Sequence, residues 1–354
     1  MKTGGFKNWK ILLIFLILIT VPVFILSSCK KSYDEFCLRA DECLLEMNFQ
    51  GTVLVAKGKK LIFEKAYGLA DEKAKHAEFL TVDSVYEAGS LTKQMTAACI
   101  MQQVEKNNLS LEDSLDKFFP DFVNGKEITI RMLLNMRSGL VDHINAPDEF
   151  YSAKKYRTLI KREKEGKAVD RDFVLESFYT APMLTKPDST YFYCNTNYYL
   201  LARILEQVSG ESYEDYMENN IFKKAGMTSA NLKFQGTSAK GYYKGLYTSI
   251  PKNVSLGCGD VNASVHDIWA WNNAFAAGKI VNKESLKQMT DSDSYGFGVY
   301  CTDKSIMHSG STNVFNSYDE YFLKEKISII VLCNKPQTSQ NATIVAGKLK
   351  KLLF

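Results

Sequence analysis

The sequence lacks the features that define several large classes of protein. Its 354 residues carry a net charge of only +4, with no dense basic stripe and no nucleic-acid-binding motif, so we expect no nucleic-acid partner. Eight cysteines do not make a disulfide scaffold in a chain this long, and no pair has the spacing of a zinc site. No repeat of roughly 20–50 residues is visible. No Gly-x-Ser-x-Gly motif is present, which argues against an α/β-hydrolase.

Histidine is also scarce, with four residues in the chain. Three of them, His76, His143 and His266, fall in no group of ligating or catalytic residues, so we expect no metal site and no cofactor. The overall composition, 45% hydrophobic and 24% charged, is that of a globular protein with a sizeable core.

The N-terminus carries a targeting signal. Three lysines precede an apolar run at 11–26, and small residues follow, which is typical of a secretory signal peptide at 1–28. The segment Leu26-Ser-Ser-Cys29 resembles the lipobox of bacterial lipoproteins, and that resemblance implies cleavage before Cys29 and lipidation of its thiol. The alternative is a single transmembrane anchor, although the run is short for one and Pro22 interrupts it.

Either reading places the rest of the chain on the extracytoplasmic side of a membrane, in the periplasm or on the cell surface. Residues 29–45 are then a polar tether that passes into a first helix. Cys37 and Cys43 would face an oxidising compartment, where their spacing permits a disulfide without requiring one.

The remaining chain has strand patterns at both ends and helical patterns between them. Runs at 51–57 and 60–65 flank Gly58-Lys59, a hairpin turn, and further strands are expected at 295–300, 305–308, 316–322 and 327–332. We predict an α+β fold in which one antiparallel sheet uses both chain ends, is flanked by terminal helices and carries an inserted all-helical lobe. The domain spans 46–354, with 46–89 and 235–354 in the sheet lobe and 90–234 in the helical lobe.

The helices are expected in the following places. A nearly all-apolar stretch at 95–101 predicts a helix buried on most sides. Ser110 and Asp113 fit a capping box for a short helix that Pro120 ends. Helical periodicity also covers 197–208, 265–275 and 342–353. Lysine and arginine are frequent at 144–180, which favours a solvated helical face over an anionic binding patch.

Ser90 and Lys93 form a candidate reactive pair. Residues three apart share a helix face, so the Ser90 hydroxyl and the Lys93 amine can meet, and a neutral amine can activate a serine. The pattern Ser-x-x-Lys is weak by itself, because it occurs six times, starting at Ser27, Ser28, Ser90, Ser114, Ser152 and Ser249.

Two later segments single out the Ser90 copy. Tyr193-Cys-Asn195 precedes a predicted helix, and His308-Ser-Gly310 ends a predicted strand. This order and spacing resemble the serine β-lactamase and penicillin-binding-protein superfamily, especially its Tyr-x-Asn branch of class C β-lactamases, D-Ala-D-Ala carboxypeptidases, esterases and peptidases. Further landmarks, such as Tyr67-Gly-Leu-Ala-Asp71 and Tyr295-Gly-Phe-Gly298, extend the resemblance over about residues 46–354.

The resemblance implies a role for each residue. Ser90 would form an acyl-enzyme, Lys93 would accept its proton, and Tyr193, with a lowered pKa, would activate water and protonate the leaving group. Asn195 would hydrogen-bond the substrate amide or the Lys93 amine. Backbone N–H groups of Ser90 and Ser311 would form the oxyanion hole.

His308, Ser309, Gly310 and Ser311 would form the strand edge that binds an extended substrate. The roles have plain alternatives: Ser90 as a helix N-cap, Tyr193 as core packing, and His308 as a structural residue that does not itself transfer a proton.

Three departures from the β-lactamase pattern shape the expected activity. His308 stands where β-lactamases have lysine, and histidine is only partly charged near neutral pH. Cys194 replaces the usual serine, and Asn313-Val-Phe315 stands where Pro-Gly-Phe is common. We therefore expect a serine hydrolase on an amide or ester, most simply peptidoglycan-type D-amino acid peptides. A carboxylesterase on small acyl esters and a penicillin-binding sensor without turnover are the alternatives.

Overall fold

The protein is represented by a computed structural model, which describes residues 33–145, 158, 161, 170–176, 179–232, 238–241, 250–335 and 341–354. The apolar run at 11–26, Cys29 and most of the charged stretch at 144–180 lie outside the described residues. Within the described ranges, no helix combines the length and apolarity needed to cross a membrane.

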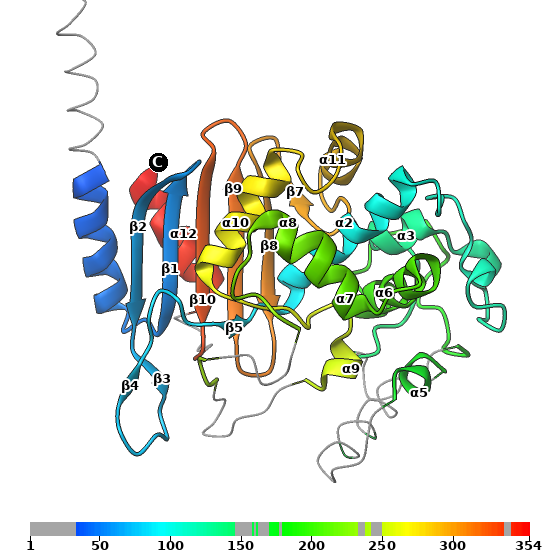
Figure 1. Cartoon of the computed structure of the whole chain (residues 1–354), viewed down its shortest axis with the longest axis horizontal. Helices are drawn as coiled ribbons and strands as arrows, with labels where there is room; N and C mark the ends of the chain where they lie inside the picture. The colour runs from blue at the N-terminus through cyan, green and yellow to red at the C-terminus, as the bar shows by residue number, and fades with distance from the viewer. Residues whose placement is uncertain are drawn as a thin grey trace, which may run out of the picture.

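A six-stranded antiparallel sheet forms the centre of the molecule, with strand order β2-β1-β10-β9-β8-β7 (Figure 1). β1 (Gly51–Lys57) pairs with both β2 (Lys60–Tyr67) and β10 (Ile327–Cys333), so the two ends of the chain meet in the middle of the sheet. The other strands are β9 (Asn316–Phe322), β8 (Ser305–Ser311) and β7 (Tyr300–Cys301). The predicted mixed fold, with one sheet built from both chain ends, is confirmed.

Helices cover both faces of the sheet, which explains why β1 and β10 are buried along nearly their whole length. On one face lie α12 (Ala342–Leu353) and a helix over 33–46, whose Phe36, Ala40 and Leu44 are buried against it. On the other face lies α10 (Val265–Ala276), which begins with a capping box between Ser264 and Asp267. The described part of the predicted 29–45 tether is thus helical and packed from residue 33.

The helical part of the molecule is built around α2 (Thr92–Glu105), whose first twelve residues are all buried. α6 (Asn195–Ser209) packs against α2 and is buried along most of its length. The smaller helical elements are η1 (Gly89–Leu91), η2 (Leu115–Lys117), η3 (Gly125–Glu127), α3 (Ile130–Leu134), α5 (Arg171–Glu176), α7 (Tyr213–Met217), η4 (Glu218–Phe222), α8 (Lys223–Ala225), α9 (Lys252–Ser255) and α11 (Lys283–Thr290). Two-stranded pairs join β3 (Leu69–Asp71) to β4 (Glu78–Phe79) and β5 (Tyr86–Glu87) to β6 (Asn262–Ala263).

Two local predictions are wrong, those of a capped helix after Ser110 and of a strand at 295–300. After Ser110 the chain forms a turn in which the Asp113 carboxylate accepts from the Ser110 N–H. The chain is then extended at Ser114, because this residue forms an antiparallel β-bridge with Thr129. Only the short η2 follows.

The expected strand at 295–300 is instead a tight turn. Tyr295 bridges Tyr300, and the Gly296 N–H donates to the Val299 carbonyl. Gly298 has a φ of 78°, which suits glycine in such a turn.

Cys37 and Cys43 are free thiols. They lie on the same helix, and six residues rotate one side chain about two-thirds of a turn away from the other. The pairing that the spacing permitted is therefore absent.

Asp319 is a buried carboxyl on β9 that faces the helices. It accepts hydrogen bonds from Asn272 Nδ2 at 2.7 Å and Gln94 Nε2 at 3.4 Å. Burial raises its pKa to about 7, although these two amides partly oppose the shift. Because the folded-state pKa lies above the ordinary value, ionised Asp319 costs stability progressively as the pH rises from about 4 to about 7, and the full cost applies above that.

Replacing Asp319 by asparagine should remove this pH-dependent cost. We expect the melting temperature of Asp319→Asn, relative to that of the unmodified chain, to rise by several degrees between pH 5 and pH 8. Thermal unfolding of both proteins in matched buffers measures the difference. A difference that stays constant across this range would contradict the assigned pKa, whatever its absolute size.

Candidate active site

Ser90 lies in η1, directly before α2. The chain leaves β5 and turns at Gly89, whose φ of 57° is in the left-handed region that glycine tolerates. The side chain of Ser90 does not cap α2, because the N-cap position is Leu91 and no side-chain cap bond is made there. Lys93 Nζ instead lies 2.9 Å from Ser90 Oγ, so the two residues meet as predicted from their spacing.

The Lys93 amine is completely buried and has three neighbouring oxygens. Besides Ser90 Oγ, these are Asn195 Oδ1 at 2.8 Å and the Cys258 carbonyl at 2.6 Å. Desolvation lowers the pKa of Lys93. An amide oxygen and a carbonyl oxygen can only accept, so a neutral amine donates its two protons to them. Its lone pair is then left for the proton of Ser90.

Tyr193 lines the same cleft, and its ring centroid lies 4.9 Å from Lys93 Nζ. Its buried hydroxyl has no hydrogen-bond partner within the described part of the chain. Burial raises the pKa of Tyr193 well above the ordinary value, and the nearby Ser90 hydroxyl only partly opposes this. The expectation of a phenol with a lowered pKa is therefore wrong: Tyr193 is a neutral hydroxyl in this structure.

Asn195 is held by a residue that the sequence did not single out, Asp142. One carboxylate oxygen of Asp142 accepts from both the backbone N–H (3.0 Å) and the Nδ2 (2.8 Å) of Asn195. The other accepts from the N–H groups of Ile144 and Asn145. Because the Asn195 amide group donates to Asp142, its oxygen is directed at Lys93. Asp142 is thus a positioning residue for the Lys93 amine.

His308 is buried in the middle of β8 among aromatic rings. Its ring centroid lies 5.3 Å from that of Tyr300, 5.8 Å from that of Tyr295 and 6.1 Å from that of Tyr193. Its Nδ1 lies 2.7 Å from the Ser309 carbonyl and must carry a proton, so Nε2, 3.1 Å from the Tyr295 hydroxyl, accepts.

Desolvation, reinforced by Lys93, lowers the pKa of His308 to about 3. The expectation of partial positive charge at this position is therefore wrong.

Gly310 and Gly89 bring β8 and η1 into close contact. A Cβ at Gly310 would lie 2.1 Å from the Ala88 carbonyl oxygen and 3.1 Å from the Ser90 nitrogen, and one at Gly89 would lie 3.0 Å from the Ser311 nitrogen. The absence of side chains here lets the backbone nitrogens of Ser90 and Ser311 approach the same end of the cleft.

The substrate-facing edge of β8 is open. β7 pairs only with Ile306 and Met307, so the edge from His308 to Ser311 has no strand partner on that side among the described residues. Ser309 and Ser311 line a cleft of about 500 Å³ together with Ser90, Tyr193 and Asn195. The described lining holds hydroxyl, amide, aromatic and aliphatic groups but no carboxylate, lysine or arginine.

Comparison with known proteins fits this arrangement. The family model described as Beta-lactamase matches residues 46–351. The chain belongs to the beta-lactamase family. PbpX of Bacillus subtilis (strain 168) is 30% identical over 322 residues, covering 88% of this chain and 76% of PbpX. Penicillin-binding protein 4* of the same organism is 26% identical, covering 86% of this chain and 72% of that protein.

A solved structure shares the fold of this family member at lower identity. D-amino acid amidase from Ochrobactrum anthropi SV3, complexed with D-phenylalanine, has a TM-score of 0.73 and 18% identity, with 91% of this chain and 99% of that chain covered. The predicted membership of the β-lactamase and penicillin-binding superfamily is confirmed. Sequence reasoning missed Asp142 and the Cys258 carbonyl, because a carboxylate two residues beyond Leu140 and a backbone oxygen carry no pattern that marks them.

Removing the acceptor character of Asp142 should slow acylation. In Asp142→Asn one carboxylate oxygen becomes an N–H₂ group, which faces N–H donors of Asn195 or of Ile144 and Asn145 and cannot accept from them. The Asn195 side chain then loses its fixed orientation, and its oxygen is no longer held at Lys93 Nζ. We expect the acylation rate to fall roughly 10–100-fold. Stopped-flow measurement with an acylating ester or penicillin gives the rate, and Asp188→Asn, at an exposed carboxylate paired with Arg137, is the control. A rate equal to that of the control would exclude the positioning role.

His308 should not titrate near neutral pH. Its buried, Nδ1-protonated ring predicts an NMR Cε1–H resonance that stays fixed between pH 5 and 8. The assignment is made by loss of that signal in His308→Asn. A midpoint within this range would show that the imidazole is solvated or charged.

Proposed function

We propose that this protein is a serine hydrolase in which Ser90 forms an acyl-enzyme, and that it cleaves an amide bond in D-amino acid peptides or amides. The observation that carries the proposal is the hydrogen bonding of Lys93. Two of its three contacts are to oxygens that only accept, and the third is to Ser90 Oγ. The lone pair of a neutral Lys93 amine therefore faces the Ser90 hydroxyl, so Lys93 can act as the base that removes the Ser90 proton.

The chemistry follows from these positions. Ser90 Oγ bonds to the substrate carbonyl carbon as its proton passes to Lys93 Nζ. The oxyanion accepts hydrogen bonds from the backbone N–H groups of Ser90 and Ser311. The C–N bond then breaks, and the departing amine takes a proton from Lys93, relayed by the unpartnered Tyr193 hydroxyl. Water releases the acyl group as an acid and returns the proton to Ser90.

The lack of charged side chains among the described lining residues indicates which leaving group the cleft accepts. No fixed cation is present among the described lining residues to receive a free carboxylate, and His308 is uncharged. Hydroxyl and amide groups favour a substrate whose leaving group ends in an amide or ester over one that ends in a carboxylate. The open edge of β8 suits an extended backbone, as in a peptide.

We further propose that the protein is exported by its N-terminal signal and works on the extracytoplasmic side of a membrane, held there by the lipid on Cys29. Cell-wall peptides are then the accessible source of D-amino acid amide bonds. A carboxylesterase on small acyl esters is the second candidate, because the same uncharged cleft also accepts a neutral ester.

A substrate panel tests the proposal. The unmodified protein is incubated with a D-alanyl-D-alanine peptide, its C-terminal amide, p-nitrophenyl acetate and a fluorescent penicillin, and adducts on Ser90 are sought by mass spectrometry. We expect turnover of the peptide amide with kcat/KM at least 10-fold above that of the free acid. Turnover of the acetate ester alone would favour the esterase. A penicillin adduct that persists without turnover of any substrate would indicate a sensor.

Two serine variants separate chemistry from folding. Ser90→Ala should lose the adduct and all turnover, while Ser114→Ala, in another Ser-x-x-Lys copy, should retain both. Ser114 bonds to Asp116 and lies outside the cleft lining. Activity that survives Ser90→Ala would refute the mechanism.

A further inference from the structure

A second cavity, which shares no lining residue with the first, lies at one end of the sheet strands. It has a volume of about 660 Å³ and is bounded by the β1–β2 turn, α8, the end of α10 and the β9–β10 turn. Its floor is apolar, with Trp269, Tyr321 and several alanines, and its rim carries Lys59, Lys224, Lys279 and Lys326. All four lysines are exposed, and no carboxylate lines the cavity within the described residues.

The cavity is a formed part of the fold. The Trp269 indole N–H donates to the Gly58 carbonyl at 2.9 Å, and the Gly58 N–H donates to the Lys326 carbonyl at 2.7 Å. These bonds tie α10 and both turns together, so the lysines are carried by fixed backbone. Four exposed cations around an apolar floor make a site that is complementary to an amphipathic anion.

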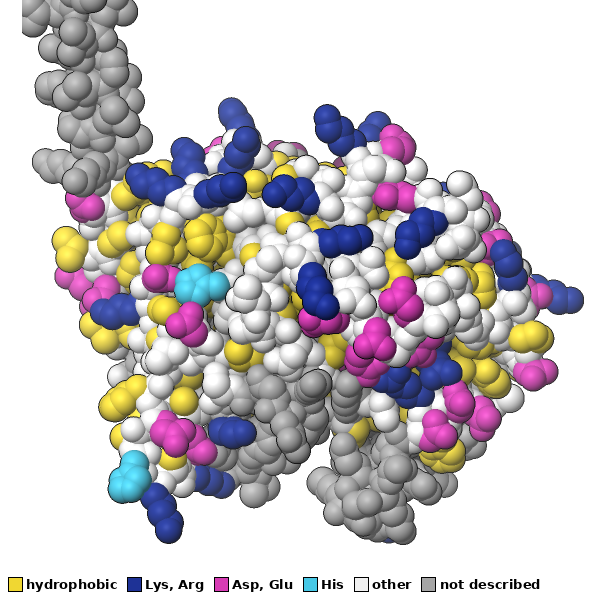
Figure 2. Space-filling view, viewed as in Figure 1, with side chains coloured by type: hydrophobic (Ala, Val, Ile, Leu, Met, Phe, Trp, Pro, Cys, Tyr) yellow, Lys and Arg dark blue, Asp and Glu magenta, His cyan; other side chains and the backbone are white. Residues whose placement is uncertain are grey.

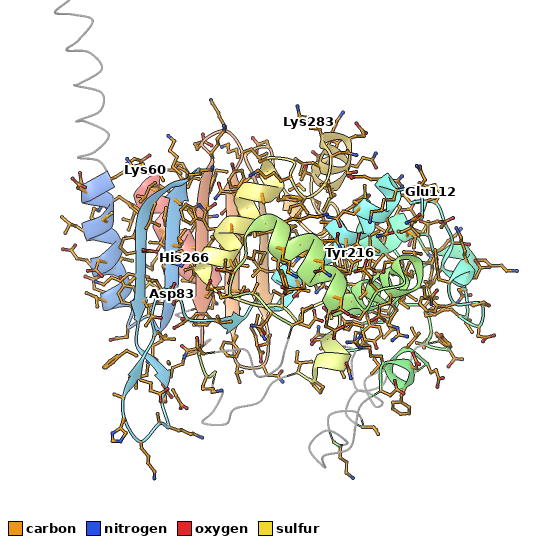
Figure 3. All side chains as sticks on the ribbon, in the orientation of Figure 1. Lys60, Asp83, Glu112, Tyr216, His266 and Lys283 are labelled. Atoms are coloured by element: carbon orange, nitrogen blue, oxygen red, sulfur yellow. The ribbon has the colours of Figure 1, made fainter. Side chains whose placement is uncertain are left out.

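The positive charge extends along the whole edge. The segments that surround the cavity contain a single glutamate, Glu325, and eight lysines, which together form the lysine edge: Lys57, Lys59, Lys60, Lys223, Lys224, Lys279, Lys324 and Lys326. Figure 2 shows dark blue side chains gathered along the upper edge of this face, where Figure 3 labels Lys60. Two exposed apolar side chains lie at the same edge, Leu323 in the β9–β10 turn and Phe354, which packs on Phe322.

The start of the described chain lies at this edge too. The helix over 33–46 begins there in Figure 1, and Lys60 Nζ lies 5.6 Å from the centroid of the Tyr33 ring. Cys29 precedes Tyr33 by four residues, which span at most roughly 14 Å. A lipid on Cys29 would thus hold Tyr33, and Lys60 beside it, within roughly 14 Å of the bilayer, which is less than two screening lengths of about 8 Å at physiological salt.

We propose that this lysine edge docks on an anionic phospholipid surface, with a headgroup phosphate seated over Trp269 between Lys59, Lys279 and Lys326. Exposed apolar residues among lysines beside an interfacial tryptophan suit the headgroup region of a bilayer. The docking rests on the proposed membrane tether and is independent of the chemistry at Ser90.

Vesicle binding tests the docking without the lipid anchor. A fragment of residues 33–354 contains every member of both buried cores, which run from Phe36 to Leu349, and therefore retains the folded unit. We expect it to sediment with phosphatidylcholine vesicles that contain phosphatidylglycerol at about one lipid in three, and not with phosphatidylcholine alone. Lys59, Lys279 and Lys326 changed together to Gln should weaken binding roughly 100-fold.

A charge-matched control and a site-specific signal complete the test. Changing Lys75, Lys126 and Lys186 to Gln removes the same charge from exposed positions elsewhere and should alter binding less than threefold. The fragment contains two tryptophans, and Trp271 is fully buried. A fluorescence blue shift with anionic vesicles that disappears in Trp269→Phe therefore places the lipid at this cavity.

Three results would overturn the docking: equal loss in both triple variants, no preference for the anionic vesicles, or binding only to a soluble anionic cell-wall polymer. Ester or amide turnover by the lysine variants, measured in parallel, should stay unchanged. Loss of turnover in the unmodified fragment would count against the proposed hydrolase and not against the docking.

Discussion

The desolvated amine of Lys93 is the constraint around which the centre of the molecule is built. A buried amine costs free energy unless its protons find acceptors, and here the acceptors come from segments 102 and 165 residues further along the chain. Helix α2, helix α6 and the loop that follows α9 must therefore meet at one nitrogen. The burial that makes a charged Lys93 amine energetically unfavourable also lowers its pKa. The neutral amine then has the lone pair that the proposed chemistry requires.

Aromatic packing extends this dry environment to the far side of the cleft. Tyr295 packs edge-on against Tyr300 and Tyr193 and donates to His308, while Tyr191 and Tyr300 share a hydrogen bond of 2.9 Å. The turn at Gly296–Gly298 places Tyr295 in this group. The cluster explains why His308 is neutral: its ring is buried among aromatic rings, and its one strong acceptor is the Ser309 carbonyl.

Much of this architecture is readable from the sequence, because it depends on local periodicity. The alternating and continuous apolar runs predict β1, β2, β9 and β10, and the apolar stretch after Ser90 predicts the burial of α2. The order of Ser90, Lys93, Tyr193 and Asn195 predicts that these residues meet. What periodicity cannot supply is the state of each group. Neighbours that are distant in sequence determine three of these properties: the raised pKa of Tyr193, the neutral imidazole of His308 and the hydrogen bonds from Asn195 to Asp142.

Strand β8 connects the lysine edge with the candidate active site. It leaves the lysine edge at Ser305 and ends beside the nucleophile at Ser311, and seven extended residues span roughly 20 Å. In the proposed docking the strand would act as a spacer: with the lysine edge on a bilayer, the mouth of the cleft would be held about that far above the lipid surface. The cleft would then accept substrates located at that height, whereas a bond at the lipid surface itself would lie below its reach.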